Sequence, residues 1–212
     1  MSTIVAIFSI AGALAMGTIS PGPSFVLVAR KAVFATRKET LLLVFGLATG
    51  AFFFAMIALL GLHAVLNAVP VAYLLLKIFG GLYLVYLGLS IWRSARKSLP
   101  ITNDPDAANQ ARGGGRAYML GLATQLSNPK TAVWFAGAFA ALMPAEPTLA
   151  FYLVVPPLAF MIDAIWYTIV TFALSSSFPR TTYLRHKAKL DYICGGIMML
   201  LGAKLISMAQ EE

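Results

Sequence analysis

The chain has 212 residues, of which 59% are hydrophobic and 11% are charged, and its mean hydropathy is +0.81. Soluble domains carry about 25% charged residues, so the charges here are too few to cover a water-facing surface. The formal net charge of +8 would suggest nucleic acid as a partner of a soluble protein, but the placement of the charges along this chain excludes that partner.

The hydrophobic residues are grouped in runs of roughly 20, the length that a helix needs to cross a bilayer. We predict an all-α membrane protein with about six transmembrane helices in a single integral membrane domain. The first run contains Ala13-Leu14-Ala15, a weak signal-peptidase pattern, but no Lys or Arg precedes it, so we expect a retained helix. The predicted spans are Thr3–Ala29, Thr40–Leu66, Pro70–Trp92, Ala117–Met143, Thr148–Ala173 and Tyr192–Met208.

Basic residues alternate between the connections that join these spans. The second and fourth connections contain no Lys or Arg, and Lys77, Lys130 and Lys204 lie in or beside spans. Because Lys and Arg near span ends are retained in the cytoplasm, we predict a bacterial inner-membrane protein with both termini on the periplasmic side. The basic residues of the first, third and fifth connections are Arg30, Lys31, Arg37, Lys38, Arg93, Arg96, Lys97, Arg112, Arg116, Arg180, Arg185, Lys187 and Lys189.

The longest connection, residues 93–116, divides the chain into two halves, 1–92 and 117–212. Its composition, which includes Pro105 and three consecutive glycines at 113–115, predicts a flexible cytoplasmic linker. Three spans in each half would enter the membrane from opposite sides, and this inverted repeat is common in secondary transporters. We therefore predict a 3+3 inverted repeat.

Two matching motifs support internal symmetry. The first span of each half contains a proline interruption, and the third span of each half contains a glycine pair followed by another glycine. These residues are Pro21, Pro23 and Pro129 for the prolines, and Gly80, Gly81, Gly88, Gly195, Gly196 and Gly202 for the glycines.

The proline interruptions predict that helices 1 and 4 are broken. A proline removes a backbone donor and displaces a carbonyl group, and irregular backbone at membrane depth occurs where it is buried in protein or lines a watery cavity. The half-helix that begins there directs a positive dipole end inward, which suits a carboxylate. A packing kink is the simpler interpretation of one proline, whereas two matched interruptions favour a substrate site. The candidate substrate-binding residues are Ser20, Pro21, Gly22, Pro23, Asn128, Pro129, Lys130 and Asp163.

Two ionisable side chains, Lys130 and Asp163, remain inside the predicted spans. Such residues usually face the interior of the bundle and mark a pathway or a proton relay. A fixed ion pair that only allows both charges to exist in the membrane is the alternative, and direct pairing stays open. We expect Asp163 to alternate between protonated and ionised forms and so to couple export to inward proton movement.

The other features carry less functional weight. Gly46 and Gly50 form a Gly-x-x-x-Gly motif, which predicts close helix packing within the fold, with a dimer contact as the alternative. The single cysteine, Cys194, excludes an intramolecular disulfide and a Cys-x-x-Cys pair. His63, near the end of the second span, and His186, in a basic loop, have no metal-ligand constellation around them. We expect no metal site and no cofactor, and one or two aromatic residues in the cavity.

Three motifs together resemble the LysE/RhtB family of amino-acid exporters: Ser20 to Pro23, Phe79 to Gly88, and Gln125 to Lys130. The resemblance covers essentially the whole chain. It implies a transporter rather than an enzyme, with amino acids and protons as its partners, contact with membrane lipid, and a homodimer as a candidate assembly. It places the family's Pro-Gly-Pro on 21–23 and its Asn-Pro-Lys on 128–130. The Asn-Pro-Lys form and the long basic connection favour the threonine and homoserine branch, with the substrate itself left open.

Two other function classes compete with this interpretation. A membrane-embedded enzyme usually shows a nucleophile, an acid cluster for magnesium or a histidine-rich metal set. Between the predicted spans, the closest acids in the sequence are Asp104 and Asp106, in the linker and with no further partner. A metal-cation exporter of the cadmium type on the same scaffold would favour several soft ligands facing a cavity. The chain has one Cys, two His and nine Met residues, so this second alternative rests on methionine.

Overall fold

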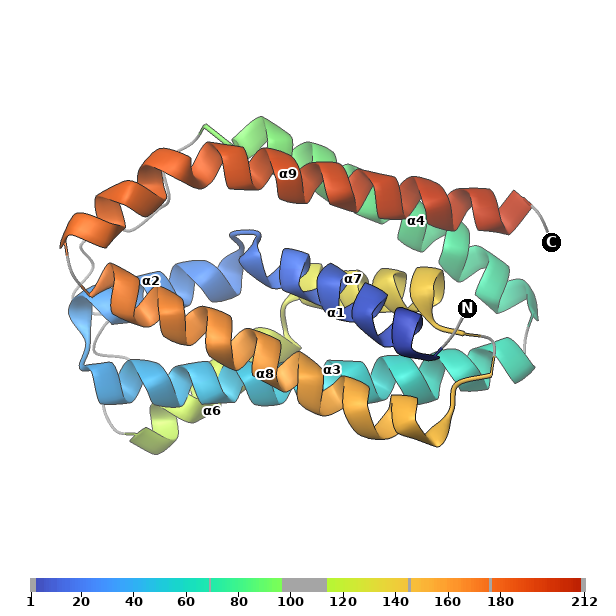
Figure 1. Cartoon of the computed structure of the whole chain (residues 1–212), viewed down its shortest axis with the longest axis horizontal. Helices are drawn as coiled ribbons and strands as arrows, with labels where there is room; N and C mark the ends of the chain where they lie inside the picture. The colour runs from blue at the N-terminus through green and yellow to red at the C-terminus, as the bar shows by residue number, and fades with distance from the viewer. Residues whose placement is uncertain (1–2, 69, 97–113, 145, 176, 211–212) are drawn as a thin grey trace.

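The computed structural model describes residues 3–68, 70–96, 114–144, 146–175 and 177–210, which form helices joined by short connections (Figure 1). Within these ranges the predicted all-α class is confirmed. Residues 97–113, most of the predicted linker, lie outside the described residues. The helices are α1 (Thr3–Ile19), α2 (Pro23–Phe34), α3 (Arg37–Ala68), α4 (Pro70–Ser94), α6 (Gly114–Leu126), α7 (Pro129–Leu142), α8 (Leu149–Leu174) and α9 (Ser177–Gln210).

Local sequence sets the starts of three helices. Thr36 and Glu39 form a capping box at the start of α3, in which Thr36 Oγ1 accepts from the Glu39 N–H and Glu39 Oε2 accepts from the Thr36 N–H, both at 3.3 Å. Pro23 and Pro129 are the first residues of α2 and α7, a position where the missing N–H costs no helical hydrogen bond. The helix breaks therefore lie where the prolines predict them.

The last helix begins earlier than its predicted membrane span. α9 starts at Ser177, so the segment around His186, which we expected to be a loop, is helical instead. No Gly or Pro occurs between Arg180 and Cys194 to interrupt the helix. The basic segment is thus the N-terminal part of α9.

Three helices of the described residues are long and apolar enough to cross a membrane: Arg37–Gly61, Leu149–Leu174 and Asp191–Ala209. The α1–α2 pair passes the same test as one broken span with a bend of 56°. The predicted fourth span is divided between α6 and α7, and α4 provides a shorter apolar stretch, Ile78–Ser94. The count of about six spans stays a prediction.

Glycines allow the backbones of α3 and α6 to touch. A Cβ atom at Gly46 would collide with the carbonyl oxygen of Tyr118, and one at Gly121 would collide with the carbonyl oxygen of Leu43. Gly50 in the same motif leaves room for the side chain of Gln125. The Gly46-x-x-x-Gly50 motif therefore packs within the fold, as the sequence predicts.

A second glycine contact joins α4 to α9. It brings the glycine motif of the first half against the glycine motif of the second half. A Cβ atom at Gly81 would meet the carbonyl oxygen of Gly202 at 2.7 Å, and one at Gly195 would meet that of Gly88 at 2.8 Å. Figure 1 shows α4 and α9 together on one side of the bundle, α3, α6 and α8 on the other, and α1, α2 and α7 between them. Backbone contact of this kind lets helices pack closely in lipid.

The buried apolar side chains of the described residues form two clusters. The first cluster joins α1, the middle of α3, α4, α7, the N-terminal part of α8 and α9. The second joins α2, the first turns of α3, the start of α6 and the C-terminal part of α8. Large members of the first cluster are Ile10, Leu14, Leu59, Leu84, Trp134, Phe135, Phe139, Phe151 and Met198. Members of the second are Phe25, Val28, Ala29, Ala32, Leu43, Val44, Leu47, Ala117, Tyr167, Val170 and Leu174.

We predict that Gly46→Ala and Gly121→Ala destabilise the fold by about 1–3 kcal/mol, because each added methyl group meets backbone that has no room to yield. Thermal unfolding of the purified protein in detergent measures the effect. Gly12→Ala and Gly61→Ala are matched controls, since their Cβ atoms meet nothing within 4 Å. Equal unfolding temperatures for Gly46→Ala and Gly12→Ala would contradict the proposed backbone contact.

Candidate functional site

The two helix breaks meet inside the bundle and bring two helix starts together. The N-cap of α2 is Gly22, in extended conformation with φ −151° and ψ −167°. The N-cap of α7 is Asn128, whose side-chain oxygen accepts from the Lys130 N–H at 3.0 Å. A side-chain hydrogen bond from Asn128 Nδ2 to Ser24 Oγ, 3.1 Å long, joins the two breaks. The positive dipole ends of α2 and α7 therefore lie beside the same pocket.

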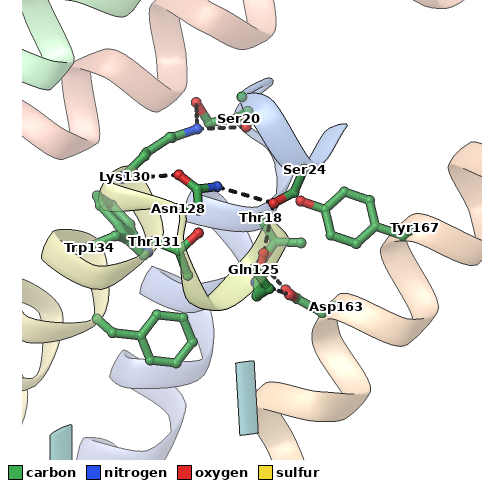
Figure 2. Close-up of a pocket in the computed structure, with 13 residues that line it drawn as sticks. Thr18, Ser20, Ser24, Gln125, Asn128, Lys130, Thr131, Trp134, Asp163 and Tyr167 are labelled. Carbon is green, nitrogen blue, oxygen red and sulfur yellow. Dashed lines mark hydrogen bonds between the residues drawn. The ribbon is translucent and has the colours of Figure 1, made fainter. Parts of the chain in front are cut away.

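A polar pocket occupies the junction of the breaks, and Figure 2 shows its side chains converging from α1, α2, α6, α7 and α8. Trp134 and Phe135 of the first cluster and Tyr167 of the second belong to its walls. The cavity volume is about 20 Å³, which is room for about one water molecule. The lining residues are Gly17, Thr18, Ser20, Gly22, Ser24, Gln125, Asn128, Lys130, Thr131, Trp134, Phe135, Asp163 and Tyr167.

Asp163 lies on α8 at one end of the pocket, and its side chain is only 3% exposed. Thr18 Oγ1 lies 2.6 Å from Asp163 Oδ1, and Gln125 Nε2 donates to Asp163 Oδ2 at 2.8 Å. The carboxyl group thus bridges the last turn of α1 and the last turn of α6. A buried carboxyl group with a partner on each oxygen meets the requirement that buried polar atoms be satisfied.

The hydroxyl group of Thr18 can serve Asp163 in either protonation state. Thr18 Oγ1 also lies 3.0 Å from the carbonyl oxygen of Leu14, and one hydroxyl hydrogen cannot serve both acceptors. When Asp163 is ionised, Thr18 donates to the carboxylate. When Asp163 is protonated at Oδ1, it donates to Thr18, which then donates to Leu14. The site therefore accommodates a proton on Asp163 without leaving a buried polar atom unsatisfied.

A chain of hydrogen bonds leads from Asp163 to the start of α7. Ser24 Oγ donates to Gln125 Oε1 at 2.7 Å, and Asn128 Nδ2 donates to Ser24 Oγ at 3.1 Å. Asn128 in turn accepts from the backbone N–H of Lys130. Gly50 of α3 provides the space that Gln125 occupies. This network fixes the relative positions of the four helices that meet at the breaks.

Lys130 lies at the other end of this network, away from Asp163 (Figure 2). Its Nζ donates to the carbonyl oxygen of Ser20 at 2.8 Å and to Ser20 Oγ at 2.9 Å. Its side chain runs past Gly22, where an added Cβ would lie 3.3 Å from Nζ. In the described part of the chain, Lys130 and Asp163 have different partners, so they form no fixed ion pair.

Most of the predicted site residues lie in the pocket, and the prolines lie next to it. Ser20, Gly22, Asn128, Lys130 and Asp163 line the cavity. The three prolines, Pro21, Pro23 and Pro129, lie at the helix breaks. They do not line the pocket. Their functional roles stay proposals.

Several polar members of the site were not among the predicted site residues. Thr18, Ser24 and Gln125 carry no charge and break no helix, so neither signal that marked the other residues applies to them. The signal that could have found two of them is their position, because Ser24 directly follows the Ser20–Pro23 motif and Gln125 is the first residue of the Gln125–Lys130 motif. One or two aromatic residues were expected in the cavity, and Trp134, Phe135 and Tyr167 line it.

Asp191 is a second buried acid that sequence analysis did not place inside the bundle. It comes directly before the predicted sixth span, so its position in the sequence resembles the end of a connection. In the structure it belongs to α9 and is only 2% exposed. Among the described residues, the bundle therefore holds a second buried acid besides Asp163.

A polar pocket with an acid and a base, built at two broken helices inside an apolar bundle, defines a class of protein: the membrane transporters. The chain belongs to the LysE type translocator family, whose sequence profile matches residues 15–209. The resemblance found in the sequence is confirmed, and the protein is a transporter, not an enzyme. It is a multi-pass inner-membrane protein.

Curated relatives cover most of the chain. The threonine efflux protein of Escherichia coli (strain K12) is 30% identical over 188 residues, which are 89% of this chain and 91% of the relative. The homoserine/homoserine lactone efflux protein of Salmonella typhi is 28% identical over 163 residues, 76% of this chain and 77% of the relative. An uncharacterized membrane protein of Haemophilus influenzae is 24% identical over 191 residues, 90% of each chain. No solved structure gives a significant match.

Proposed function

We propose that this protein is a secondary-active exporter that carries amino acids out of the bacterial cytoplasm. The observation that carries the proposal is the pair of opposite charges at the two ends of one buried polar network, Asp163 at one end and Lys130 at the other. The zwitterion of an amino acid has the complementary charges. The names of the threonine and homoserine efflux relatives support the same substrate class.

The proposed binding mode follows from the placement of the charges. The substrate's ammonium group binds Asp163 and displaces the donors of Thr18 or Gln125. Its carboxylate binds Lys130 and lies beside the starts of α2 and α7, whose dipoles favour an anion. Each charge of the bound substrate then has an opposite charge beside it, which is necessary because burying an unpaired charge is costly.

The groups between the two charges suit a hydroxylated side chain. Ser24, Gln125 and Asn128 offer both donors and acceptors along the pocket. A substrate with a hydroxyl group can replace one of these hydrogen bonds, whereas an apolar side chain leaves the groups unpaired. We therefore favour substrates of the threonine and homoserine type.

A cavity of about 20 Å³ is too small for an amino acid, so the proposed transport cycle requires the pocket to widen before a substrate binds. The two apolar clusters are the proposed gates on either side of it. Alternate opening of the two clusters gives access to one side of the membrane at a time.

Proton coupling is proposed at Asp163. The ionised carboxylate binds the substrate's ammonium group, whereas protonation cancels that attraction and directs the carboxyl hydrogen to Thr18. Protonation from the periplasmic side releases the substrate there, and loss of the proton to the cytoplasm restores the binding site. One inward proton then accompanies each substrate that leaves.

The proposed architecture is a 3+3 inverted repeat of halves 1–92 and 117–212, with both termini periplasmic. The glycine contacts between α4 and α9 support it, since Gly81 faces Gly202 and Gly88 faces Gly195, as a two-fold axis between matching helices requires. The alternation of basic connections supports the orientation. A homodimer and specific lipid contacts stay predictions.

Export is tested in cells that lack their own amino-acid exporters and are loaded with dipeptides, so that amino acids accumulate inside. We expect cells that produce this protein to lose threonine or homoserine faster than cells that carry an empty vector. Loss of cadmium, with every amino acid retained, would instead favour the metal-cation alternative.

Proton coupling is tested with Asp163→Asn, which keeps the shape of the side chain and removes its exchangeable charge. We expect uphill export to fall to the level of the empty vector, because the variant cannot take up and release a proton. The matched control is Glu146→Gln, which removes the carboxylate of an exposed residue that does not line the pocket. Undiminished uphill export by the Asp163→Asn protein would end the coupling hypothesis.

The orientation is tested by joining a reporter enzyme that folds only outside the cytoplasm to the C terminus. The charge pattern predicts an active reporter. The same reporter placed after Arg93, at the start of the predicted cytoplasmic linker, is expected to be inactive and serves as the control. The opposite pair of results would reverse the proposed topology.

A further inference from the structure

Thr131 is a polar residue of the pocket to which the proposed binding mode gives no role. It lines the cavity and is partly buried, and its hydroxyl group has no hydrogen-bond partner among the described residues. The other hydroxyl groups on aliphatic side chains of the lining, those of Thr18, Ser20 and Ser24, are all hydrogen-bonded. The hydroxyl group of Thr131 is therefore available to a ligand without the loss of an existing bond.

The break before α7 determines where this hydroxyl group lies. Asn128 caps the helix and Pro129 is its first residue, so Thr131 belongs to the first turn. In Figure 2 the side chain of Thr131 lies between those of Lys130 and Asp163. These two residues are the proposed partners of the substrate's carboxylate and ammonium group. Both groups are attached to the α-carbon, so the first atoms of the substrate's side chain also lie between them, on the level of Thr131.

The wall of the pocket beside Thr131 is held in place by aromatic contacts. Trp134 and Phe135, three and four residues further along α7, lie on the same face of the helix and line the pocket. Trp134 Nε1 donates to the carbonyl oxygen of Ala13 at 3.2 Å, and its indole ring occupies the space that a Cβ atom at Gly17 would take. A wall fixed in this way gives the neighbouring hydroxyl group a defined position toward the substrate.

The other polar groups of the pocket are less suited to recognising a substrate hydroxyl group. Ser24 donates to Gln125 and accepts from Asn128, so a ligand that binds one of these three side chains replaces a hydrogen bond that already exists. A ligand hydroxyl group that binds Thr131 adds a hydrogen bond instead. Each hydroxyl group is both a donor and an acceptor, so the pair can form in either direction. A methyl group in the same place would leave Thr131 without a partner in the closed site.

We propose that Thr131 is a specificity-determining residue that binds the side-chain hydroxyl group of the exported amino acid. It selects a hydroxylated amino acid such as threonine over an apolar one of the same shape, such as valine. This inference rests on the proposed function, because it requires an amino acid held between Lys130 and Asp163. It assigns the recognition of the side chain to the first turn of α7.

The test is Thr131→Val, which replaces the hydroxyl group with a methyl group, in proteoliposomes that contain the purified protein. Threonine and valine are the two substrates, because they differ by the same replacement. We expect kcat/KM for threonine to fall about tenfold, since one hydrogen bond to the substrate is lost. We expect kcat/KM for valine not to fall, so the ratio of the two constants reports the change in specificity.

Two further variants control for effects on the structure. Thr131→Ser keeps the hydroxyl group and is expected to keep the preference for threonine. Thr124→Val makes the same replacement at a partly buried threonine of α6 that does not line the pocket, and it is expected to leave the ratio unchanged. An equal fall of both constants in Thr131→Val would indicate a structural role and would overturn the inference.

A measurement on the unaltered protein covers the case in which Thr131→Val does not fold. Uptake of labelled threonine is inhibited with unlabelled threonine or with valine, and we expect valine to require about a tenfold higher concentration. Equal inhibition by the two amino acids would overturn the inference while leaving the exporter function intact. The absence of transport of any amino acid by the unaltered protein would instead refute the proposed function itself.

Discussion

The structure depends on the requirement that every backbone polar group inside an apolar environment find a partner. Two helices stop at mid-bundle and two others begin there, which exposes helix ends at a depth where water is scarce. The protein satisfies these ends by placing the breaks against each other. Asn128 caps α7 and also donates to Ser24, so one amide serves both breaks. The polar site is thus a direct product of the way in which the fold satisfies its own interrupted backbone.

The same arrangement explains why the acid and the base of the site are kept apart. A direct ion pair between Lys130 and Asp163 would neutralise both groups and leave little attraction for a zwitterion. Instead, Ser20 holds Lys130, while Thr18 and Gln125 hold Asp163. Neutral donors and acceptors satisfy each ionisable group separately, which the proposed exchange for substrate groups requires. The charges therefore stay available, which fits a carrier better than a fixed structural pair.

The extent to which the sequence predicted this structure follows from the strength of each local signal. Pro23 and Pro129 marked the breaks correctly, because a proline after an extended Gly22 or Asn128 favours a new helix start. The same rule fails in α8, where Pro156 and Pro157 lie inside an unbroken helix that surrounding helices support. The contacts of Thr18 and Gln125 with Asp163 could not be predicted, since they depend on the three-dimensional approach of α1 and α6 to α8. Asp191 was missed because the boundary of a hydrophobic run does not show where burial begins.

The two apolar clusters also determine what the protein does to the membrane that contains it. A membrane protein with an acid and a base in its centre could let ions leak across the membrane and dissipate the ion gradients of the cell. Here buried aromatic and aliphatic side chains lie on both sides of the polar pocket, with Trp134 and Phe139 in one cluster and Phe25 and Leu47 in the other. Ions would have to shed their hydration to pass either layer. These two apolar layers would therefore oppose ion leakage through the polar centre and so preserve the membrane potential.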